Sequence, residues 1–137
     1  MRRFSYGMGA LANRPRFLVV DHNCDSRFLL VKCLLRKFPD AAIDETDDGD
    51  LAIELVRHAD ITAVISHRTT EQLGVELVAA FRAVNPAIPI VMVSGIDRTP
   101  PAIAAGADRF LLSDEWLRLG TVVEELLHKR AQAAAPH

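Results

Sequence analysis

Residues 17–25 read FLVVDHNCD, in which four consecutive apolar residues run directly into a polar turn. An apolar run without alternation is typical of a strand buried on both faces. From Ser26 to Phe38 the apolar residues recur at helical spacing, and Pro39 ends the pattern. The stretch therefore predicts a strand, a turn and a helix whose apolar face is formed by Phe28, Val31, Leu35 and Phe38.

The same alternation of strand and helix recurs four more times along the chain. We predict strands over residues 41–46, 61–65, 88–93 and 109–112, and helices over residues 51–59, 74–85, 101–105 and 114–131. Two helices have clear apolar faces, formed by Leu77, Val78 and Phe81 in one and by Leu119, Val122, Val123 and Leu126 in the other.

Strict alternation of strands and helices predicts the α/β class, with a parallel sheet covered by helices on both faces. The strands around Val19, Val64, Val91 and Leu111 are apolar throughout, as expected of strands buried on both faces. The strand around Ile43 is half polar, which favours an edge position. We therefore expect a doubly wound, flavodoxin-like sheet of five strands in the order 2-1-3-4-5, counted along the chain.

Length and composition indicate a single globular domain. The chain has 137 residues, of which 50% are apolar and 25% are charged, and its formal net charge is −2. Residues 1–16 hold four arginines and no acid, so the remainder carries about −6 and offers no basic surface for DNA or RNA. We divide the chain into a basic flexible leader (1–15), a folded domain (16–131) and a C-terminal tail (132–137).

The sequence predicts neither a membrane segment nor a disulfide framework. No run approaches the roughly 20 apolar residues that span a bilayer, and polar residues interrupt the stretch after Arg2 and Arg3, unlike a signal peptide. Cys24 and Cys33 form no C-x-x-C pair, so two reduced thiols are expected. We predict a cytoplasmic protein without a membrane partner.

Function in such a sheet is expected at the carboxyl ends of the strands. The residues that follow the predicted strands there are Asp21 and His22, Ser66 and His67, Ser94 and Gly95, and Ser113 and Asp114. This edge is too poor in charge to suggest catalysis. We therefore interpret the chain as a binding module without a cofactor, and not as an enzyme.

Five stretches, in this order and spacing, resemble the receiver domain of two-component response regulators. They are residues 18–23 (LVVDHN), 46–49 (TDDG), 73–77 (LGVEL), 89–94 (PIVMVS) and 105–111 (AGADRFL). The resemblance covers about residues 16–130. It implies the flavodoxin-like sheet, a role in bacterial-type phosphorelay signalling, and a pocket built around a phosphorylated aspartate.

Carried over residue by residue, the resemblance implies a vestigial phosphorylation pocket. Ser66 stands where the family has its phosphoacceptor aspartate, and Ser113 stands where it has a lysine. Of the acidic pair that binds Mg²⁺ in the family, Asp21 is kept and His22 replaces the other acid. The hydroxyl after the fourth strand is kept as Ser94. The chain therefore resembles a degenerate, pseudo-receiver type.

The usual phosphotransfer reaction needs the groups that are replaced. Mg²⁺ prefers several carboxylate and phosphate oxygens, so a single carboxylate holds it poorly. Phosphoryl transfer depends on positioning and charge stabilisation, and the lysine is missing as well as the acceptor. We therefore predict no metal and no phosphate switch at this edge. A phospho-accepting regulator that uses an unusual pocket is the first alternative.

A small hydrolase or metal-dependent enzyme on the same fold is the second alternative. Asp21, His22 and His67 could hold a transition metal, although histidines on surface loops are usually solvated. A serine hydrolase is disfavoured because Ser94 lies in MVSGI rather than in G-x-S-x-G. The sequence also lacks the glycine-rich loops that bind nucleotides.

The family transmits its signal through the face formed by the fourth helix, the fifth strand and the fifth helix. Phe110, Trp116 and Leu117 are candidates for contacts there, although Phe110 could equally be core and Trp116 a buried contact. Pro100 and Pro101 shorten the fourth helix, which we expect to begin at the prolines. We predict phosphorylation-independent docking of a signalling protein, or of a second copy, on this face.

Overall fold

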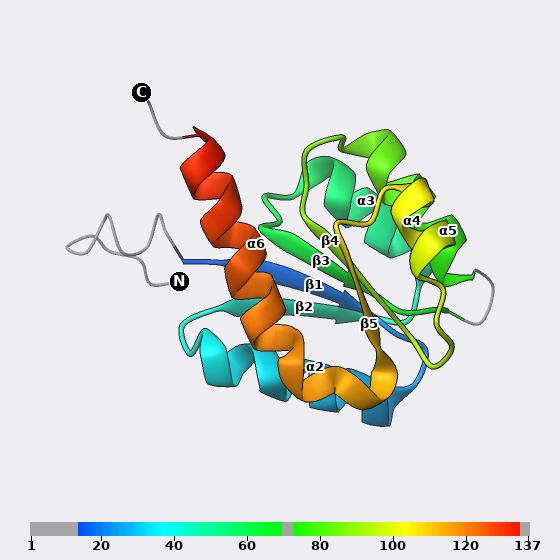
Figure 1. The fold of residues 1–137 in the computed structure, drawn as a ribbon, viewed down its shortest axis with the longest axis horizontal. Helices are drawn as coiled ribbons and strands as arrows, with labels where there is room; N and C mark the ends of the chain where they lie inside the picture. Colours follow the sequence, from blue (N-terminus) through cyan, green and yellow to red (C-terminus); the bar gives the residue numbers. More distant parts are fainter. Residues whose placement is uncertain (1–13, 70–72, 135–137) are drawn as a thin grey trace.

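The computed structural model describes residues 14–69 and 73–134. Five parallel strands form one sheet in the order β2-β1-β3-β4-β5, which confirms the predicted class and strand order (Figure 1). The strands are β1 (Arg16–Val20), β2 (Ala42–Thr46), β3 (Ala63–Ser66), β4 (Ile90–Ser94) and β5 (Arg109–Leu112).

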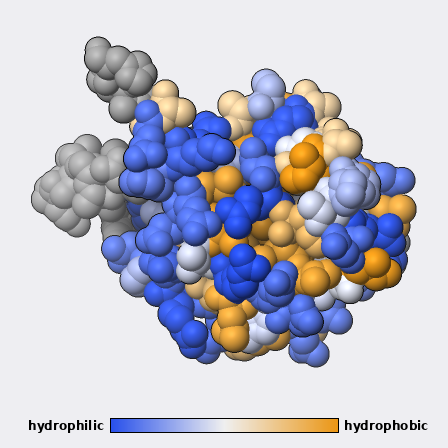
Figure 2. Space-filling model, viewed as in Figure 1, coloured by the Kyte–Doolittle hydropathy of each residue, from blue (hydrophilic) through white to orange (hydrophobic). Residues whose placement is uncertain are grey.

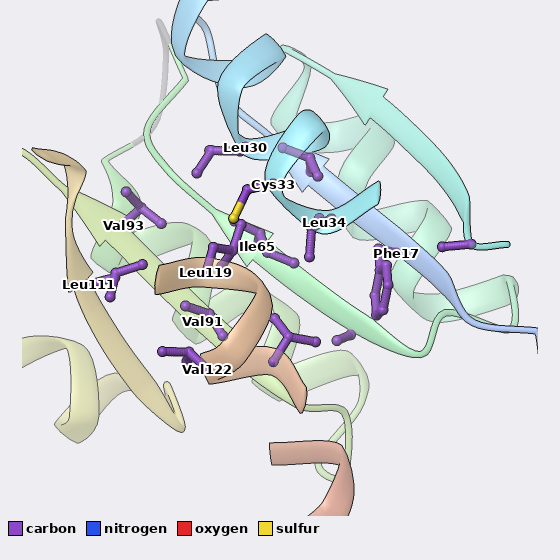
Figure 3. Packing of buried hydrophobic residues seen from close by; sticks show 14 residues of the cluster. Phe17, Leu30, Cys33, Leu34, Ile65, Val91, Val93, Leu111, Leu119 and Val122 are labelled. Carbon is purple, nitrogen blue, oxygen red and sulfur yellow. The ribbon is translucent and has the colours of Figure 1, made fainter. Parts of the chain in front are cut away.

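Helices cover both faces of this sheet. α2 (Cys24–Lys37) and α6 (Leu119–Ala134) pack on one face, and the other face is covered by α3 (Gly49–His58), α4 (Gly74–Val84) and α5 (Thr99–Ala105) (Figure 1). Each face buries its own apolar cluster. Figure 3 shows the first, in which Leu34 of α2 and Leu119 of α6 lie against Ile65 of β3.

Side-chain caps decide where the first two helices begin. Asn23 Oδ1 accepts hydrogen bonds from Asp25 N and Ser26 N, at 2.9 and 3.0 Å, and Asp48 caps α3 in the same way. Such caps satisfy backbone donors that the first turn leaves free. Both helices therefore begin earlier than the apolar periodicity predicts.

The buried face of α2 agrees with the prediction only in part. Val31 and Phe38 pack against the core, as predicted, whereas Phe28 is 59% exposed and Leu35 is 37% exposed. The buried residues of the helix are Leu30, Cys33 and Leu34. Both sets of residues recur at helical spacing, so periodicity alone could not choose between them. Packing against β1 and α6 turns Leu30, Cys33 and Leu34 inward. The predicted faces of α4 and α6 are confirmed, because Leu77, Val78, Phe81, Leu119, Val122 and Val123 are all buried.

The prediction that the fifth strand is buried on both faces is wrong. Of the residues of β5 only Leu111 is buried, whereas β1, β3 and β4 are buried almost throughout. The reason is position, since β5 pairs with β4 alone and forms the second edge of the sheet.

The chain after β5 does not form one continuous helix. A 3₁₀ turn, η1 (Ser113–Arg118), comes first, and α6 then continues beyond the predicted end at residue 131. α5 is short, as predicted, with Pro100 and Pro101 in its first turn and its start at the preceding Thr99. No helix in the described parts of the chain is long and apolar enough to cross a membrane.

Candidate functional site

The predicted pocket residues come together at the carboxyl edge of the sheet. Asp21 follows β1, Ser66 ends β3, Ser94 ends β4, and Ser113 begins the turn after β5. The parallel register brings these strand ends level, since Val20 pairs with Ser66 across β1 and β3. A small cavity of about 30 Å³ opens there, lined by Asp21, Ser26, Leu29, Leu30, His67, Val93, Ser113 and Trp116. We call it the Asp21 cavity; its volume is about that of one water molecule.

Among the described residues, Asp21 is the only acid that lines this cavity, and its side chain is fully buried. Its Oδ1 accepts a hydrogen bond from Asn23 N at 3.0 Å, and its Oδ2 accepts one from the Ser26 hydroxyl. His67 Nδ1 lies 3.1 Å from Oδ1. Each carboxylate oxygen therefore already faces a donor of the chain itself.

These contacts also set the charge of Asp21. Burial raises the pKa of its carboxyl group, but the His67 ring, the Ser26 hydroxyl and the Asn23 N–H together outweigh burial. The pKa consequently lies below the ordinary 3.8. Asp21 is thus a buried carboxylate that stays ionised at neutral pH because neighbouring side chains and backbone stabilise the charge.

His67 is the residue of this site that the sequence-based set of pocket residues omitted. Its side chain is 16% exposed, and its backbone N–H donates to Val20 O at 2.8 Å. Nδ1 is buried and meets no acceptor of the described residues in good hydrogen-bond geometry, so the 3.1 Å approach to Asp21 is its nearest polar contact. His67 follows the predicted third strand just as Asp21 follows the first, and this position was the sequence feature that could have identified it as a residue of the site.

His22 follows Asp21 directly in the sequence, but its ring lies farther from the Asp21 carboxylate than the ring of His67 does. Its Nδ1 is 3.2 Å from Arg68 O and 3.7 Å from Asp21 Oδ1, and its side chain is 39% exposed. Its backbone N–H also donates to Arg68 O. His22 is therefore held mainly by the loop after β3, and it contributes no second acid beside Asp21.

The three serines of the predicted pocket differ in their surroundings. Ser66 is fully buried, and its hydroxyl makes only a long contact, 3.4 Å, to His67 O. Ser94 Oγ accepts a hydrogen bond from Ile96 N at 3.3 Å, which holds the turn after β4. Ser113 lines the Asp21 cavity. Only Ser113 of these three therefore faces the carboxylate across that space.

The chemistry that this arrangement can perform is limited. Within residues 14–69 and 73–134, no three histidine, cysteine or acidic side chains are grouped so that they could hold a metal ion. In the same residues no serine hydroxyl bonds to the His67 ring, as a Ser-His-Asp hydrolase requires. The geometry thus gives no support to the metal-dependent or hydrolytic alternatives.

The candidate interface residues occupy different environments. Phe110 is half-buried and packs against the cluster beneath α4 and α5, whereas Trp116 is half-buried against the cluster beneath α2 and α6. Leu117 is 60% exposed on η1. Phe110 and Trp116 therefore contribute partly to the core, and a role of the three residues in contacting a partner stays a prediction.

Comparisons with known proteins address the fold directly. No protein-family model and no curated protein matches the chain. Among solved structures, a CheY-like response regulator receiver domain protein from Methanospirillum hungatei JF-1 is similar with a TM-score of 0.79 at 16% identity, over 89% of this chain and 100% of that one.

Two further structures are similar at somewhat higher identity. A mutant receiver domain of the histidine kinase CKI1 from Arabidopsis thaliana has a TM-score of 0.69 at 27% identity, over 82% of this chain and 89% of that one. The receiver domain of NtrX from Brucella abortus has a TM-score of 0.67 at 25% identity, over 82% and 98%. The chain thus has the receiver-domain fold of response regulators.

Proposed function

We propose that this chain is a non-enzymatic, receiver-like signalling domain that acts by protein–protein contact without being phosphorylated. The observation that carries the proposal is the state of Asp21. Its carboxylate is buried, ionised and already surrounded by donors from Asn23, Ser26 and His67. The family's pocket instead needs carboxylate oxygens that are open to Mg²⁺.

A divalent cation would have to displace these internal partners. Mg²⁺ demands near-octahedral oxygen coordination and dehydrates reluctantly. Here a single carboxylate is present, His22 supplies no second one, and the imidazole of His67 occupies the approach to Oδ1.

The acceptor and the cation of the phosphotransfer reaction are both replaced by hydroxyls. Ser66 cannot form an acyl phosphate, and its hydroxyl is fully buried at the end of β3. Ser113 offers no positive charge to a phosphoryl oxygen. A conventional phosphorylated state therefore has neither an attachment point nor a counter-charge at this edge.

A docking surface consistent with the fold is the face formed by α5, β5 and η1 with the start of α6. Ile103 on α5 is 47% exposed and Leu117 on η1 is 60% exposed, while Phe110 of β5 is half-buried. Exposed apolar side chains of this size are typical of contact sites. We assign this face to a signalling protein or to a second copy of the chain.

Covalent labelling tests phosphorylation independence. The chain is incubated with Mg²⁺ and acetyl phosphate, and its intact mass is measured. We expect no phosphoryl adduct on the wild type. The positive control is a variant with Ser66→Asp, His22→Asp and Ser113→Lys, which restores the family's residues. A stoichiometric adduct on the wild type would refute the proposal.

Light scattering over a range of protein concentrations tests the docking face. If a second copy binds there, Leu117→Asp converts a concentration-dependent dimer into a monomer. The matched control is Leu51→Asp, at a site on α3 that is 49% exposed and away from this face. A dimer that persists in Leu117→Asp but is lost in the control would contradict the assignment.

A further inference from the structure

The outward face of α2 carries large apolar side chains that the fold leaves exposed. Phe28 is 59% exposed and Leu35 is 37% exposed, and the seven positions between them span about 10 Å of helix. Lys32 and Arg36 lie on the same face, because these four residues recur at helical spacing. We call them the α2 stripe. Figure 2 shows hydrophobic side chains between hydrophilic ones along the lower edge of the molecule, where α2 lies in Figure 1.

The two basic side chains of the α2 stripe have no acidic partner among the described residues. The neighbouring Lys37 of the same helix pairs with Glu124 of α6. Lys32 and Arg36 are exposed, and within residues 14–69 and 73–134 they form no ion pair. The rest of the chain contains one acidic side chain, Glu71, which comes in the sequence shortly before α4, a helix of the other sheet face.

The contact between Lys32 and Phe28 shows how the charge and the apolar surface are combined. Lys32 Nζ lies 5.5 Å from the centre of the Phe28 ring, close enough for a cation–π interaction. This interaction holds the ammonium group beside the apolar surface but leaves its N–H donors to other acceptors. The α2 stripe therefore offers an apolar patch and a positive charge within a single contact area.

The charge of the rest of the chain restricts the kind of anion that can approach. Residues 17–137 carry a net charge of about −6, since they hold 12 of the basic residues and all 18 acids. An extended anionic surface, such as a bilayer or a nucleic acid, would be repelled by that net charge. Two cations beside two apolar side chains instead match a short segment that is both acidic and apolar.

We propose that the α2 stripe docks an acidic amphipathic helix of a partner protein. Leucine-like side chains of that helix pack against Phe28 and Leu35, and carboxylates beside them accept charge-assisted hydrogen bonds from Lys32 and Arg36. A helix suits the site because two of its apolar side chains, seven positions apart, repeat the same distance of about 10 Å. This docking site goes beyond the proposed function, since α2 lies outside the face of α5, β5 and η1.

A helical peptide of about 20 residues tests the chemistry of the partner. It carries leucine at helical spacing with glutamate beside it, and two further peptides replace every glutamate by lysine or by glutamine. Binding to the full chain is measured by calorimetry and mapped by amide shifts. We expect the glutamate peptide to shift Lys32 and Leu35, and to bind about tenfold more tightly than the lysine peptide, a difference of about 1.4 kcal/mol.

Four outcomes of the peptide experiment would overturn the proposal. They are no measurable binding of the glutamate peptide, equal affinities for the glutamate and lysine peptides, shifts confined to α5 and β5, and binding to phosphatidylglycerol vesicles without binding of the glutamate peptide. Proline in the middle of the glutamate peptide breaks its helix and should abolish binding. Unchanged affinity of that proline peptide would refute a helical partner.

Substitutions separate the α2 stripe from other exposed residues. Lys32→Gln with Arg36→Gln should weaken binding of the glutamate peptide about tenfold and leave binding of the glutamine peptide unchanged. Phe28→Ala should weaken both peptides, because it removes apolar contact area. The matched control for the charges is Arg98→Gln with Lys129→Gln, at two exposed basic residues outside α2, and it should have no effect.

The control for Phe28→Ala is Leu51→Ala, at a leucine of α3 that is also exposed. Urea unfolding of each variant checks that the fold is intact, as expected for exposed positions. Unchanged peptide affinity in the double variant, or an equal loss in its control, would contradict the inference. A phosphoryl adduct on the wild type would refute the proposed function and leave the peptide result standing, so the two failures are distinguishable.

Discussion

The Asp21 cavity and a second hollow, between the loops after β3 and β4, lie next to each other at the carboxyl edge and share His67, yet they are built in opposite ways. The cavity holds about 30 Å³ and a buried carboxylate whose oxygens face internal donors. The second hollow holds about 500 Å³ and has exposed apolar side chains, Leu73 and Ile96, among its lining residues. A polar group that is buried and hydrogen-bonded stabilises the fold, whereas an exposed side chain contributes little to folding.

The largest effect is expected from removing the carboxylate of the cavity. Asp21→Ala leaves the Ser26 hydroxyl and Asn23 N without their acceptor, and it removes the carboxylate that lies 3.1 Å from the buried His67 Nδ1. The free energy of unfolding should fall by about 3 kcal/mol, measured by urea denaturation. Asp25→Ala, at an exposed acid of the same helix end, should cost less than about 1 kcal/mol. Equal losses would show that the internal contacts of Asp21 contribute nothing.

A second substitution restores the family's own residue at the end of β3. Ser66→Asp adds a carboxylate at a fully buried position, at the same edge of the sheet as the ionised Asp21, and we expect a loss of about 2 kcal/mol at pH 7. Adding Ser113→Lys should recover part of it. Ile96→Asp introduces the same charge at an exposed position of the second hollow and should change stability by less than about 0.5 kcal/mol. Similar losses at both positions would remove the contrast between the buried edge of the sheet and the exposed loops beside it.

The pH dependence of unfolding isolates the charge of Asp21. Because the pKa of this group is below 3.8 in the folded chain, the unfolded chain binds its proton at a higher pH than the folded chain does. The contribution of Asp21 is therefore complete above about pH 5 and is lost as the pH falls through the folded-state pKa. Urea unfolding in a pH series should show that the free energy of unfolding falls toward acid pH in the wild type, and that it falls less in Asp21→Asn.

A matched comparison strengthens that pH experiment. Asp25→Asn leaves every contact of Asp21 in place and should keep the wild-type dependence on pH. If Asp21→Asn lost as much stability at acid pH as the wild type, a group other than Asp21 would have to be responsible for the pH dependence.

The sequence predicted the sheet and its order well, because the apolar strands and the α4 and α6 faces follow from burial alone. The inward face of α2 was predicted correctly for Val31 and Phe38 but wrongly for Phe28 and Leu35, since Phe28 and Leu30 both belong to helical repeats and only packing distinguishes them. The approach of His67 to Asp21 joins residues 46 positions apart, and it depends on side-chain directions that periodicity does not contain. The second hollow arises from the loops after β3 and β4, which carry no periodic signal.

Fluorescence of Trp116 tests the central claim most directly, because it is the single tryptophan and it lines the Asp21 cavity. The chain is titrated with Mg²⁺ and then with beryllofluoride, a mimic of the phosphoryl group, and the same titration is repeated on Asp21→Asn. The account predicts no saturable change in the wild type, because the carboxylate is occupied by its own neighbours. A saturable change in the wild type that disappears in Asp21→Asn would show that the pocket still binds the metal and the phosphate mimic, and would contradict the account.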